Sequence, residues 1–337
     1  MTTPGLTPPA ITVLMSCFNA ARWLDEAVDS VLRQSLKDFE FIIVDDGSSD
    51  GTLDMIRRHA ERDSRVVVIS KPNTGLADSL NAGIQAARGK WIARLDADDT
   101  CEPTRLESQL AVATANSNLV FVGSGLTVID QFGNCGKTYR YPRRHATLAN
   151  HLRTARRFPP HSSAFYRTAS VRAVGGYRPR IRRAQDRDLW LRLAEVGELA
   201  CLRAPLVRVR KHGGQVSHED GGKRQVIDSR MAIVSHYLRM HDFEDPVGDH
   251  ESSFDSFFGW IVLQLENGGF FEYVSFNRHV RALYRGAPNP VAGALQATCA
   301  LLRQRGLVTR TLRARLLGEN MPRRLARDWM SQRCSPS

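Results

Sequence analysis

Residues 39–52 read FEFIIVDDGSSDGT, and residues 90–99 read KWIARLDADD. Each segment is a short apolar run that suits a buried strand, followed at once by a cluster of aspartates. Another apolar run, Ala10–Met15, lies nearer the amino terminus, and segments with helical spacing separate the three runs. This alternation predicts a βαβ layer structure with a largely parallel sheet, whose ligands bind beyond the carboxyl ends of its strands.

The alternation of apolar runs with segments of helical spacing extends along the chain in both directions. Strands are expected at 10–15, 39–44, 65–70, 90–95, 119–130 and 199–210. Helices are expected at 20–32 with Asn19 as cap, at 50–60 with Asp50 as cap, at 76–87, after Pro103 and at 184–196. Gly123 and Gly125 predict a bend. Beyond Arg224 the pattern is mostly helical, so we expect one domain over 1–220 and a mainly α-helical basic region over 221–337.

Charge is the outlying property of the composition. The chain has 337 residues and a formal charge of +12. The charge is −4 over residues 1–100, +9 over 101–200, 0 over 201–300 and +7 over 301–337. The positive charge is mostly arginine in two blocks, Lys137–Arg192 and Arg303–Arg333, which predicts an acidic partner for those blocks and not for the first third.

Cysteine usage and apolar runs bear on the compartment. The six cysteines are scattered without a CxxC pair or a zinc-type Cys/His cluster, which indicates reduced thiols. Residues Met1–Pro9 lack the pattern of a signal peptide, and no stretch of 18 apolar residues occurs. We therefore expect a cytoplasmic protein.

Three acidic clusters follow or precede the expected elements: Asp45-Asp46, Asp96–Asp99, and Asp186 with Asp188. A single aspartate after a strand is usually a turn former. Two clusters at one sheet edge repel each other unless a cation or hydrogen-bond donors compensate, and carboxylate oxygens favour Mg²⁺ or Mn²⁺ shared with phosphates. GxGxxG and GxxxxGK[ST] are both missing from the sequence, which removes the main support for a dinucleotide or P-loop site.

Five segments in order resemble the family 2 glycosyltransferases of the GT-A fold, over about residues 10–217. They are VLMSCFNAARWLDEAVDSVLRQSLKDFEFIIVDDGSSDGT (13–52), KPNTGLADSLNAGIQAARGKWIARLDADD (71–99), VGGYR (174–178), AQDRDLWLRLAEVG (184–197) and VRVRKHGGQVS (207–217). The resemblance implies an α/β, Rossmann-like GT-A fold with a mostly parallel mixed sheet flanked by helices. It also implies a nucleotide-sugar glycosyltransferase domain over 1–220.

The resemblance implies a donor site at the strand ends. Its expected contacts with the nucleotide sugar are Phe18, Asn19, Asp45, Asp46, Asn73, Gly75, Asp96, Arg210 and His212. Among these, Asp45 and Asp46 would hold base and ribose, and Phe18 would stack on the base. Asp98 would bind the divalent cation, Mn²⁺ or Mg²⁺, that bridges the diphosphate. Arg210 and His212 belong to a loop that would close over that diphosphate, with Gly213-Gly214 as its hinge.

The same resemblance places the catalytic base at Asp186. An inverting transfer needs a carboxylate opposite the departing diphosphate, to take the proton of the acceptor hydroxyl. His161 and Gln185 fall near the acceptor in this scheme. Relatives usually carry Glu where Gln185 stands, and proline where Ser16 stands, so acceptor inference from relatives is weaker. Asp78 has no explanation from the sequence.

Several of these residues also have structural interpretations. Asp188 is expected to orient arginines at a helix start, and Trp190 to lie in the core. His161 could equally be a hydrogen-bonded structural histidine. Arg210 and His212 could form a solvated edge.

The carboxyl-terminal segment 301–317 has an apolar face with Leu301, Val308 and Leu312 and many arginines. Such a helix lies on anionic lipid or packs on its own domain. The chain lacks both membrane spans and a Gln-x-x-Arg-Trp signature, which favours transfer of a single sugar. A peripheral position on the cytoplasmic face of the membrane follows as an expectation.

Three functions therefore stay open. The first is an inverting, metal-dependent transferase that uses a nucleoside-diphosphate sugar, with UDP as the default, and a cell-envelope glycan or lipid-linked acceptor in polysaccharide biosynthesis. The second is a catalytically silent homologue that binds nucleotide sugar. The third is a nucleic-acid-binding or signalling module, which the lack of stacking aromatics in the basic blocks disfavours, so no nucleic acid is expected as partner. The oligomeric state does not follow from the sequence.

Overall fold

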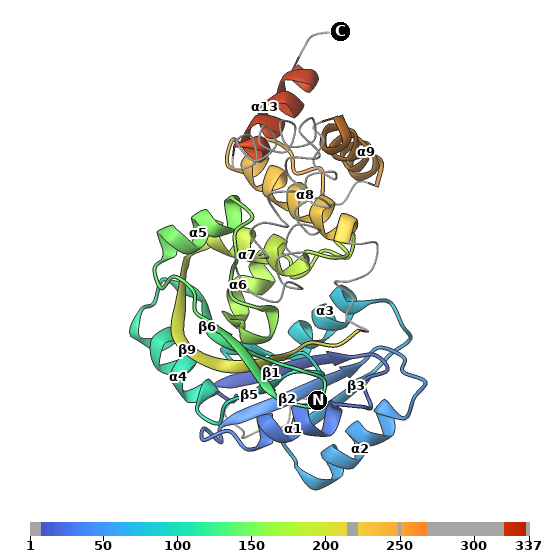
Figure 1. The fold of residues 1–337 in the computed structure, drawn as a ribbon, viewed down its shortest axis with the longest axis vertical. Helices are drawn as coiled ribbons and strands as arrows, with labels where there is room; N and C mark the ends of the chain where they lie inside the picture. The colour runs from blue at the N-terminus through green and yellow to red at the C-terminus, as the bar shows by residue number, and fades with distance from the viewer. Residues whose placement is uncertain (1–7, 214–221, 249–250, 268–319, 335–337) are drawn as a thin grey trace, which may run out of the picture. The chain divides into compact units, whose positions relative to one another are not determined.

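The computed structural model describes residues 8–213, 222–248, 251–267 and 320–334. The chain divides into two compact units, Met1–Glu219 and Asp220–Ser337, and each is described by itself. The first unit contains the sheet and seven α-helices of the described chain (Figure 1).

Nine strands of the described chain form one sheet, in the order β3-β2-β1-β4-β8-β6-β9-β5 with β7 paired to β6. Their bounds are β1 Ile11–Cys17, β2 Phe39–Asp45, β3 Val66–Ser70, β4 Trp91–Arg94, β5 Thr100–Cys101, β6 Leu119–Ile129, β7 Cys135–Tyr139, β8 Phe165–Arg167 and β9 Glu198–Arg210. The first four strands pair in parallel, as the alternation predicts. Antiparallel pairs of β8 with β4 and β6, of β7 with β6, and of β5 with β9 make the sheet mixed.

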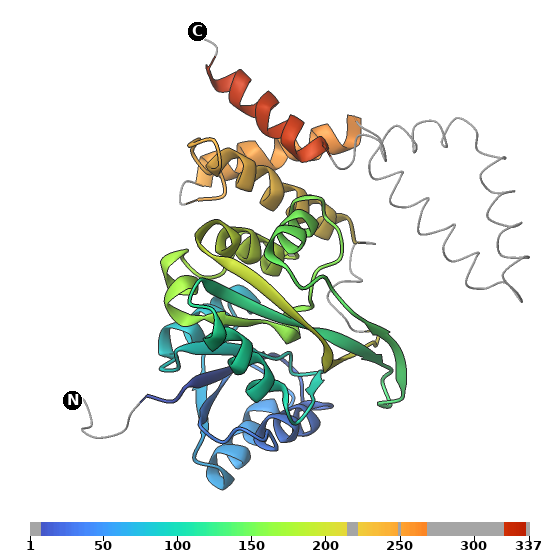
Figure 2. The same ribbon diagram turned by 90° about the vertical axis from the view of Figure 1, so that its left-hand side faces the viewer.

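Helices cover both faces of this sheet. Their bounds are α1 Leu24–Leu32, α2 Thr52–Arg62, α3 Leu76–Ala86, α4 Arg105–Ala115, α5 His145–Arg153, α6 Thr168–Ala173 and α7 Gln185–Val196, with a short 3₁₀ turn at His161–Ser163. Helices α1, α2 and α4 pack on one face, whereas α3, α6 and α7 lie on the other (Figure 1). The long strands β6 and β9 run side by side in parallel (Figure 2).

The core explains why the apolar runs form these strands. All seven residues of β1 and of β2 are buried, because helices lie on both faces of the sheet. Alternate residues such as Val13 and Phe41 point into the cluster that also holds Leu24, Val28 and Ile56 from α1 and α2. Burial of these side chains fixes the register of the strands and therefore the position of their ends.

The structure corrects the expected start of the first helix and confirms the expected bend in the strand at 119–130. The first helix begins at Leu24 and not near residue 20, because Asn19 takes a left-handed conformation with φ 49° instead of capping a helix. The bend expected at Gly123 and Gly125 is confirmed by a register shift between Ser124 and Gly125, where β6 pairs with β9.

The second unit is helical where it is described. Its helices are α8 Lys223–Arg239, α9 Glu251–Asn267 and α13 Met321–Cys334. The ring of Trp329 lies 5.0 Å from Phe257 and 5.1 Å from Trp260, centroid to centroid, so aromatic packing joins α13 to α9. The expected amphipathic helix at 301–317 lies outside the described residues. Among the described helices, none is long and apolar enough to cross a membrane.

Candidate functional site

Four strand ends meet at one edge of the sheet, because β3, β2, β1 and β4 are consecutive parallel neighbours. Cys17 pairs with Asp45 and Asp45 with Ser70, while Leu14 pairs with Arg94. The loops that follow these strands therefore leave the sheet on the same side, where ligands of parallel sheets bind. These loops carry the predicted donor-site residues up to Asp98.

The carboxylate of Asp46 organises one of these loops. It forms an ion pair with Lys71 and accepts hydrogen bonds from the backbone nitrogens of Thr74 (3.0 Å) and Gly75 (2.9 Å). Burial by itself would raise the pKa of Asp46, but these bonds outweigh it and hold that pKa below its ordinary value. Asp46 thus stays ionised and fixes the loop 71–75, and its contact with ribose or base stays a prediction.

Asn19 links the loops after β1 and β2. Its Oδ1 accepts a hydrogen bond from the backbone nitrogen of Ser49 (2.9 Å), and its own backbone nitrogen donates to Ser48 Oγ (3.0 Å). Asp45, which is almost fully buried, accepts from the backbone nitrogen of Ser48 (3.3 Å). Both residues thereby brace the turn that follows β2.

Phe18 and Asn73 are the exposed members of this group. Phe18 has 51% of its surface exposed, which is unusual for phenylalanine. Gly47, with φ 72°, allows the close approach of the Asn73 loop, since a Cβ at Gly47 would lie 2.8 Å from the Asn73 backbone nitrogen. Both side chains remain accessible to a ligand, and the stacking and edge contacts expected of them stay predictions.

Asp96 carries the first carboxylate of the second cluster. It forms an ion pair with the buried guanidinium of Arg94 and accepts a hydrogen bond from Ser162 Oγ (2.6 Å). Burial would raise the pKa of Asp96, but Arg94 and the Ser162 hydroxyl outweigh it and hold that pKa below its ordinary value. A buried cation beneath the sheet edge therefore keeps Asp96 charged.

Asp98 and Asp99 lack such compensation. Burial, followed by repulsion from Asp96, raises the pKa of Asp98, although His212 opposes this with its Nε2 2.9 Å from Asp98 Oδ2. Burial and repulsion from both neighbours raise the pKa of Asp99 well above its ordinary value. Burial and the mutual repulsion of these carboxylates therefore disfavour the ionised forms of Asp98 and Asp99.

The donor set fits a divalent cation shared with a ligand. No group of three or more His, Cys, Asp or Glu side chains arranged around a metal site is found in the part of the chain that the structure describes. Asp98 and His212 nevertheless present one carboxylate and one imidazole, and Mg²⁺ or Mn²⁺ at phosphate sites commonly takes its other ligands from phosphate and water. A cation there would also relieve the repulsion between Asp96 and Asp98.

Arg210 occupies a buried position at the end of β9, not a solvated edge. Its guanidinium contacts Glu26 Oε2 (2.6 Å) and donates to the backbone oxygens of Asp98 (2.9 Å) and Asp130 (3.2 Å). Its backbone nitrogen donates to Asp99 Oδ1 (2.8 Å). Arg210 therefore ties the Asp98 loop to α1 and β9, and contact with a diphosphate stays a prediction.

His212 is held on two sides. Besides its contact with Asp98, its ring lies 4.3 Å from the ring of Trp23, centroid to centroid. The expected hinge begins at Gly213, and its second glycine, Gly214, lies outside the described residues.

Asp186 lies in the first turn of α7, which Gln185 begins. Its Oδ1 accepts a hydrogen bond from the backbone nitrogen of Arg187 (2.7 Å), while the residue remains partly exposed. Burial raises the pKa of Asp186; Arg187 opposes this and Asp96 adds to it, so the pKa is above the ordinary value. The structure thus brings Asp186 within electrostatic reach of Asp96, as a carboxylate more basic than usual.

His161 and Gln185 make contacts within the protein. His161 Nε2 lies 2.7 Å from the Tyr177 hydroxyl, and burial lowers the pKa of His161 to about 3, so the ring is neutral. Gln185 Nε2 donates to the Arg182 backbone oxygen (2.6 Å). Hydrogen bonding of His161 is confirmed, and the acceptor contacts of both residues stay predictions.

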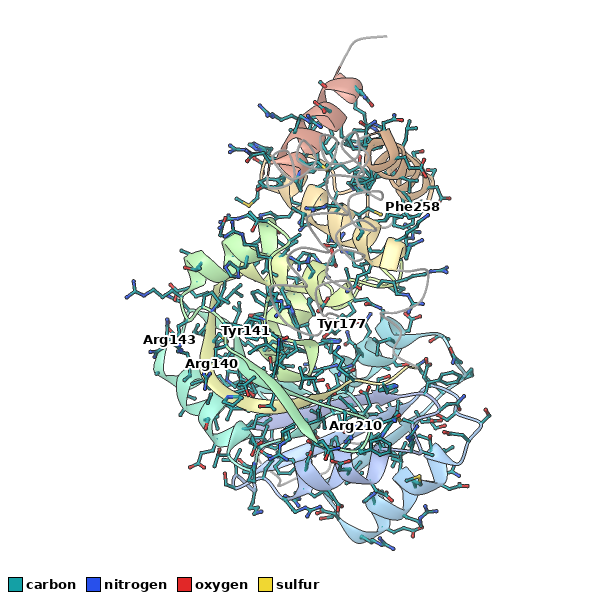
Figure 3. The ribbon with its side chains drawn as sticks, viewed as in Figure 1. Arg140, Tyr141, Arg143, Tyr177, Arg210 and Phe258 are labelled. Carbon is teal, nitrogen blue, oxygen red and sulfur yellow. The ribbon has the colours of Figure 1, made fainter. Side chains whose placement is uncertain are left out.

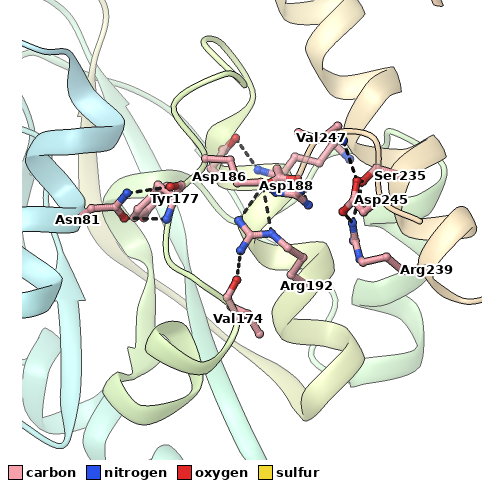
Figure 4. Close-up of polar contacts among 12 residues, drawn as sticks. Asn81, Val174, Tyr177, Asp186, Asp188, Arg192, Ser235, Arg239, Asp245 and Val247 are labelled. Carbon is pink, nitrogen blue, oxygen red and sulfur yellow. Dashed lines mark hydrogen bonds and ion pairs between the residues drawn. The ribbon is translucent and has the colours of Figure 1, made fainter. Parts of the chain in front are cut away.

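Asp188 forms the buried support beneath Asp186. It is fully buried, and its carboxylate accepts hydrogen bonds from Arg178 Nε (3.0 Å) and from Arg192 Nε (3.1 Å) and NH2 (2.6 Å) (Figure 4). Arg192 also donates to the Val174 backbone oxygen (2.5 Å). The structural interpretation of Asp188 is therefore confirmed, and so is the core position of Trp190, which is 1% exposed.

Sequence reasoning missed several residues that shape this site, chiefly Arg94, Ser162 and Tyr177, and it gave Asp99 no role of its own within the acidic cluster. Ser162 Oγ bridges Asp96 and Asp99. Tyr177 is anchored by Asn81, whose side chain makes two 2.8 Å hydrogen bonds with the Tyr177 backbone (Figure 4). An arginine at the end of a short apolar strand was the one available signal, since a buried cation needs a partner. The structure also explains Asp78. It lies in the first turn of α3, where the helix dipole stabilises a carboxylate.

The chain is similar in sequence to known proteins. Residues 12–175 match the family described as Glycosyl transferase family 2. The chain is 38% identical over 194 residues to the putative glycosyltransferase EpsE of Bacillus subtilis, covering 56% of this chain and 68% of EpsE.

Two solved structures are similar in fold. TarS 1–349 of S. aureus in complex with UDP-GlcNAc has a TM-score of 0.58 at 15% identity, covering 93% of this chain and 91% of that one. The mannosyltransferase PcManGT of Pyrobaculum calidifontis, in complex with GDP-Man and Mn²⁺, has a TM-score of 0.53 at 20% identity, covering 94% and 87%. The expected GT-A type of α/β fold, with a helical carboxyl-terminal region, is thereby confirmed.

Proposed function

The chain belongs to glycosyl transferase family 2, and on this premise we propose that it is an inverting, metal-dependent transferase. It moves a single sugar from a nucleoside-diphosphate sugar, by default a UDP-sugar, to a cell-envelope glycan or lipid-linked acceptor. Residues 1–220 form its transferase domain. Support for the donor comes from the fold neighbours, which bind UDP-GlcNAc and GDP-Man.

The observation that carries this proposal is the presence of two different carboxylates, Asp98 and Asp186, within electrostatic reach of Asp96. Asp98 belongs to a cluster of mutually repelling carboxylates suited to a cation, whereas Asp186 stands on another element, is partly exposed and has a raised pKa. Asp98 can therefore bind the cation that stabilises the leaving diphosphate, and Asp186 can accept the proton of the attacking hydroxyl.

In the proposed mechanism Asp186 accepts the proton of the acceptor hydroxyl as its oxygen attacks the anomeric carbon. The bond from that carbon to the diphosphate oxygen breaks in the same step, with inversion, and the nucleoside diphosphate leaves. Asp98 and His212 would hold the divalent cation, which, when bound, stabilises the charge of the leaving diphosphate. Asp188, through Arg178 and Arg192, holds α7 so that Asp186 stays in place.

The donor contacts of Phe18, Asn19, Asp45, Asp46, Asn73, Gly75 and Asp96 are part of the same proposal, as are those of Arg210 and His212. Phe18 stacks on the base, since its ring is exposed beside the strand ends. His161 and Gln185 face the acceptor.

A basic carboxyl-terminal region completes the proposal. Residues 301–337 carry a charge of +7, which attracts anionic lipid, and we place the protein at the cytoplasmic face of the membrane through this region. Flotation of the chain with phosphatidylglycerol vesicles, but not with phosphatidylcholine vesicles, is the expected outcome.

Donor hydrolysis tests the transferase proposal. The full chain is screened with UDP-, GDP- and dTDP-sugars in the presence of Mn²⁺, and release of nucleoside diphosphate is measured. Because water can replace the acceptor, an active enzyme turns over slowly without one, whereas a silent binder shows no release. Asp186→Asn should lower the rate about 10²–10⁴-fold, as expected for loss of a general base.

Asp54→Asn is the matched control for Asp186→Asn. Asp54 also lies in the first turn of a helix, α2, but its side chain is 71% exposed and pairs only with Arg57 at 3.5 Å. A folded Asp186→Asn protein with the activity of the Asp54→Asn control would disprove the base assignment.

A further inference from the structure

A pocket in the first unit is lined largely by arginine and has no place in the site described above. It has a volume of about 340 Å³ and opens to solvent. We call it the arginine pocket; its polar lining residues are Arg140, Tyr141, Arg143, Arg144, Thr147 and Arg203. Figure 3 shows Arg140, Tyr141 and Arg143 together beside β9, apart from Arg210 and Tyr177.

The backbone around the arginine pocket is fixed by contacts between two segments. Cys201 donates its backbone hydrogen to the Arg143 oxygen (3.3 Å), and Leu199 donates to His145 Nδ1 (3.2 Å). Gly125 permits close packing beneath, because a Cβ there would lie 2.9 Å from the backbone oxygens of both Arg203 and Tyr139. The segment between β7 and α5 is therefore held against β9, and these contacts fix the backbone that carries the guanidinium groups.

The charge of this pocket is uncompensated. In the part of the chain that the structure describes, Arg140, Arg143, Arg144 and Arg203 make no side-chain hydrogen bond or ion pair, and acidic residues are missing from the pocket lining. Elsewhere in the unit arginines pair with carboxylates, such as Arg65 with Asp63 (2.7 Å). Residues 131–185 contain 13 Lys and Arg and not one Asp or Glu. Gathering four cations without a counter-charge is unfavourable unless an anion binds among them.

The donor types select the anion. Guanidinium groups match phosphate oxygens with paired N–H donors, and Thr147 and Tyr141 add hydroxyl groups. Burial raises the pKa of Tyr141 to about 12, so its hydroxyl keeps the proton it would donate. Four of the seven lining residues are arginines, whereas common cofactor pockets have few charged residues in their lining.

Helix α5 relates the arginine pocket to the proposed transfer site. Arg144 and Thr147 lie at its amino-terminal end, whereas the Leu152 oxygen at its other end accepts a hydrogen bond from Arg187 NH1 (2.8 Å), next to Asp186. Nine helical residues span about 13 Å. A ligand in the pocket is therefore separate from the reacting sugar, and a molecule that reaches both must be elongated.

We propose that the arginine pocket is a second anion-binding site, which holds a phosphate group of an elongated acceptor while that acceptor's hydroxyl lies at Asp186. The assignment to the acceptor rests on the proposed transferase function. The phosphate belongs either to a lipid-linked acceptor or to a phosphate-containing polymer, because the same donors recognise both.

Binding of inorganic pyrophosphate to the full chain tests the site. Calorimetric titration in buffer with chelator excludes divalent cations, so a metal-bridged donor site does not compete. The Arg143→Gln/Arg203→Gln variant should bind pyrophosphate about tenfold or more weakly than the wild type, since each charge-assisted contact is strong. The affinity of the wild type should fall with added salt.

The matched control is Arg58→Gln/Arg62→Gln, which removes the same charge from exposed positions on α2. Equal affinity of the two double variants, or no binding by the wild type, would overturn the proposal. All four positions are exposed, so both variants should fold, which circular dichroism checks.

Competition distinguishes the sources. Displacement of pyrophosphate by vesicles that contain a polyprenyl phosphate supports a lipid-linked acceptor, and displacement by a soluble glycerol-phosphate oligomer supports a polymer. Tighter pocket-dependent binding of a DNA oligonucleotide than of the oligomer of equal charge would overturn the proposal in favour of nucleic acid. Donor hydrolysis is measured separately. If the transferase proposal is wrong but the pocket binds anions, pyrophosphate binding will depend on the pocket while no donor is hydrolysed.

Discussion

At the scale of the residue, environment separates carboxylates that look alike in the sequence. Asp46 and Asp96 have lowered pKa values because Lys71 and Arg94 outweigh their burial. Asp186 has a raised pKa because burial outweighs the opposing charge of Arg187. The aspartates and their order could be predicted from the sequence, but these differences depend on how deeply the fold buries each carboxylate and on which neighbours it places in contact.

The raised pKa of Asp186 gives a pH prediction. A base must be ionised to act, so transfer should be lost as the pH falls through the pKa of Asp186, and the acidic limb of kcat/KM should lie above about pH 4, where an ordinary aspartate titrates. Replacement of Arg187 by glutamine removes a charge that lowers this pKa, so the limb should move to higher pH.

Measurement of UDP binding over the same pH range controls for loss of the donor. A limb that stays in place in Arg187→Gln, with constant UDP affinity, would argue that another group is the base.

At the scale of the element, helix α7 shows how a buried pair positions a site. The sequence predicts a helix over 184–196, and the structure has it at Gln185–Val196. The periodicity also predicts β1 and β2 within two residues of their bounds. It fails at the start of α1, because the contacts of Asn19 with Ser48 and Ser49 come from another strand end.

Asp188→Asn should destabilise the protein strongly. It leaves Arg178 and Arg192 without their buried counter-charge, which costs about 3–5 kcal/mol of unfolding free energy. Urea denaturation followed by fluorescence measures this loss. Asp29→Asn is the control, because its ion pair with Arg33 is exposed and contributes about 0.5 kcal/mol or less. Similar losses in both variants would contradict the positioning role of Asp188.

At the scale of the whole molecule, charge is divided by function. The first hundred residues carry −4 and supply the strand-end aspartates, whereas the next hundred carry +9 and supply three of the four arginines of the arginine pocket. The total of +12 therefore describes neither part.

Linkage gives a prediction for the intact chain. UDP with Mn²⁺ at about 100 times its Kd should add about 2.7 kcal/mol to the free energy of unfolding, which a thermal shift detects. Asp98→Asn should lose the Mn²⁺-dependent part of the shift, because it removes the proposed ligand of the cation. The Asp54→Asn control should keep it, and an equal shift in both variants would refute the metal assignment.

The sequence by itself determined most of the alternation of strands and helices over residues 10–130, the helix at 184–196, the family resemblance and the candidates Asp98 and Asp186, because periodicity and motif order are local properties of the chain. It did not predict the short elements β5, β7, β8, α5 and α6. Only the tertiary structure decided which aspartates are compensated, that Arg210 is buried between Glu26 and the Asp98 loop, and that Arg203 stands beside Arg143. The last two facts depend on residues that the fold brings together from about 60 to 180 positions apart, and the first depends on which carboxylates the fold buries, so no local pattern contains that information.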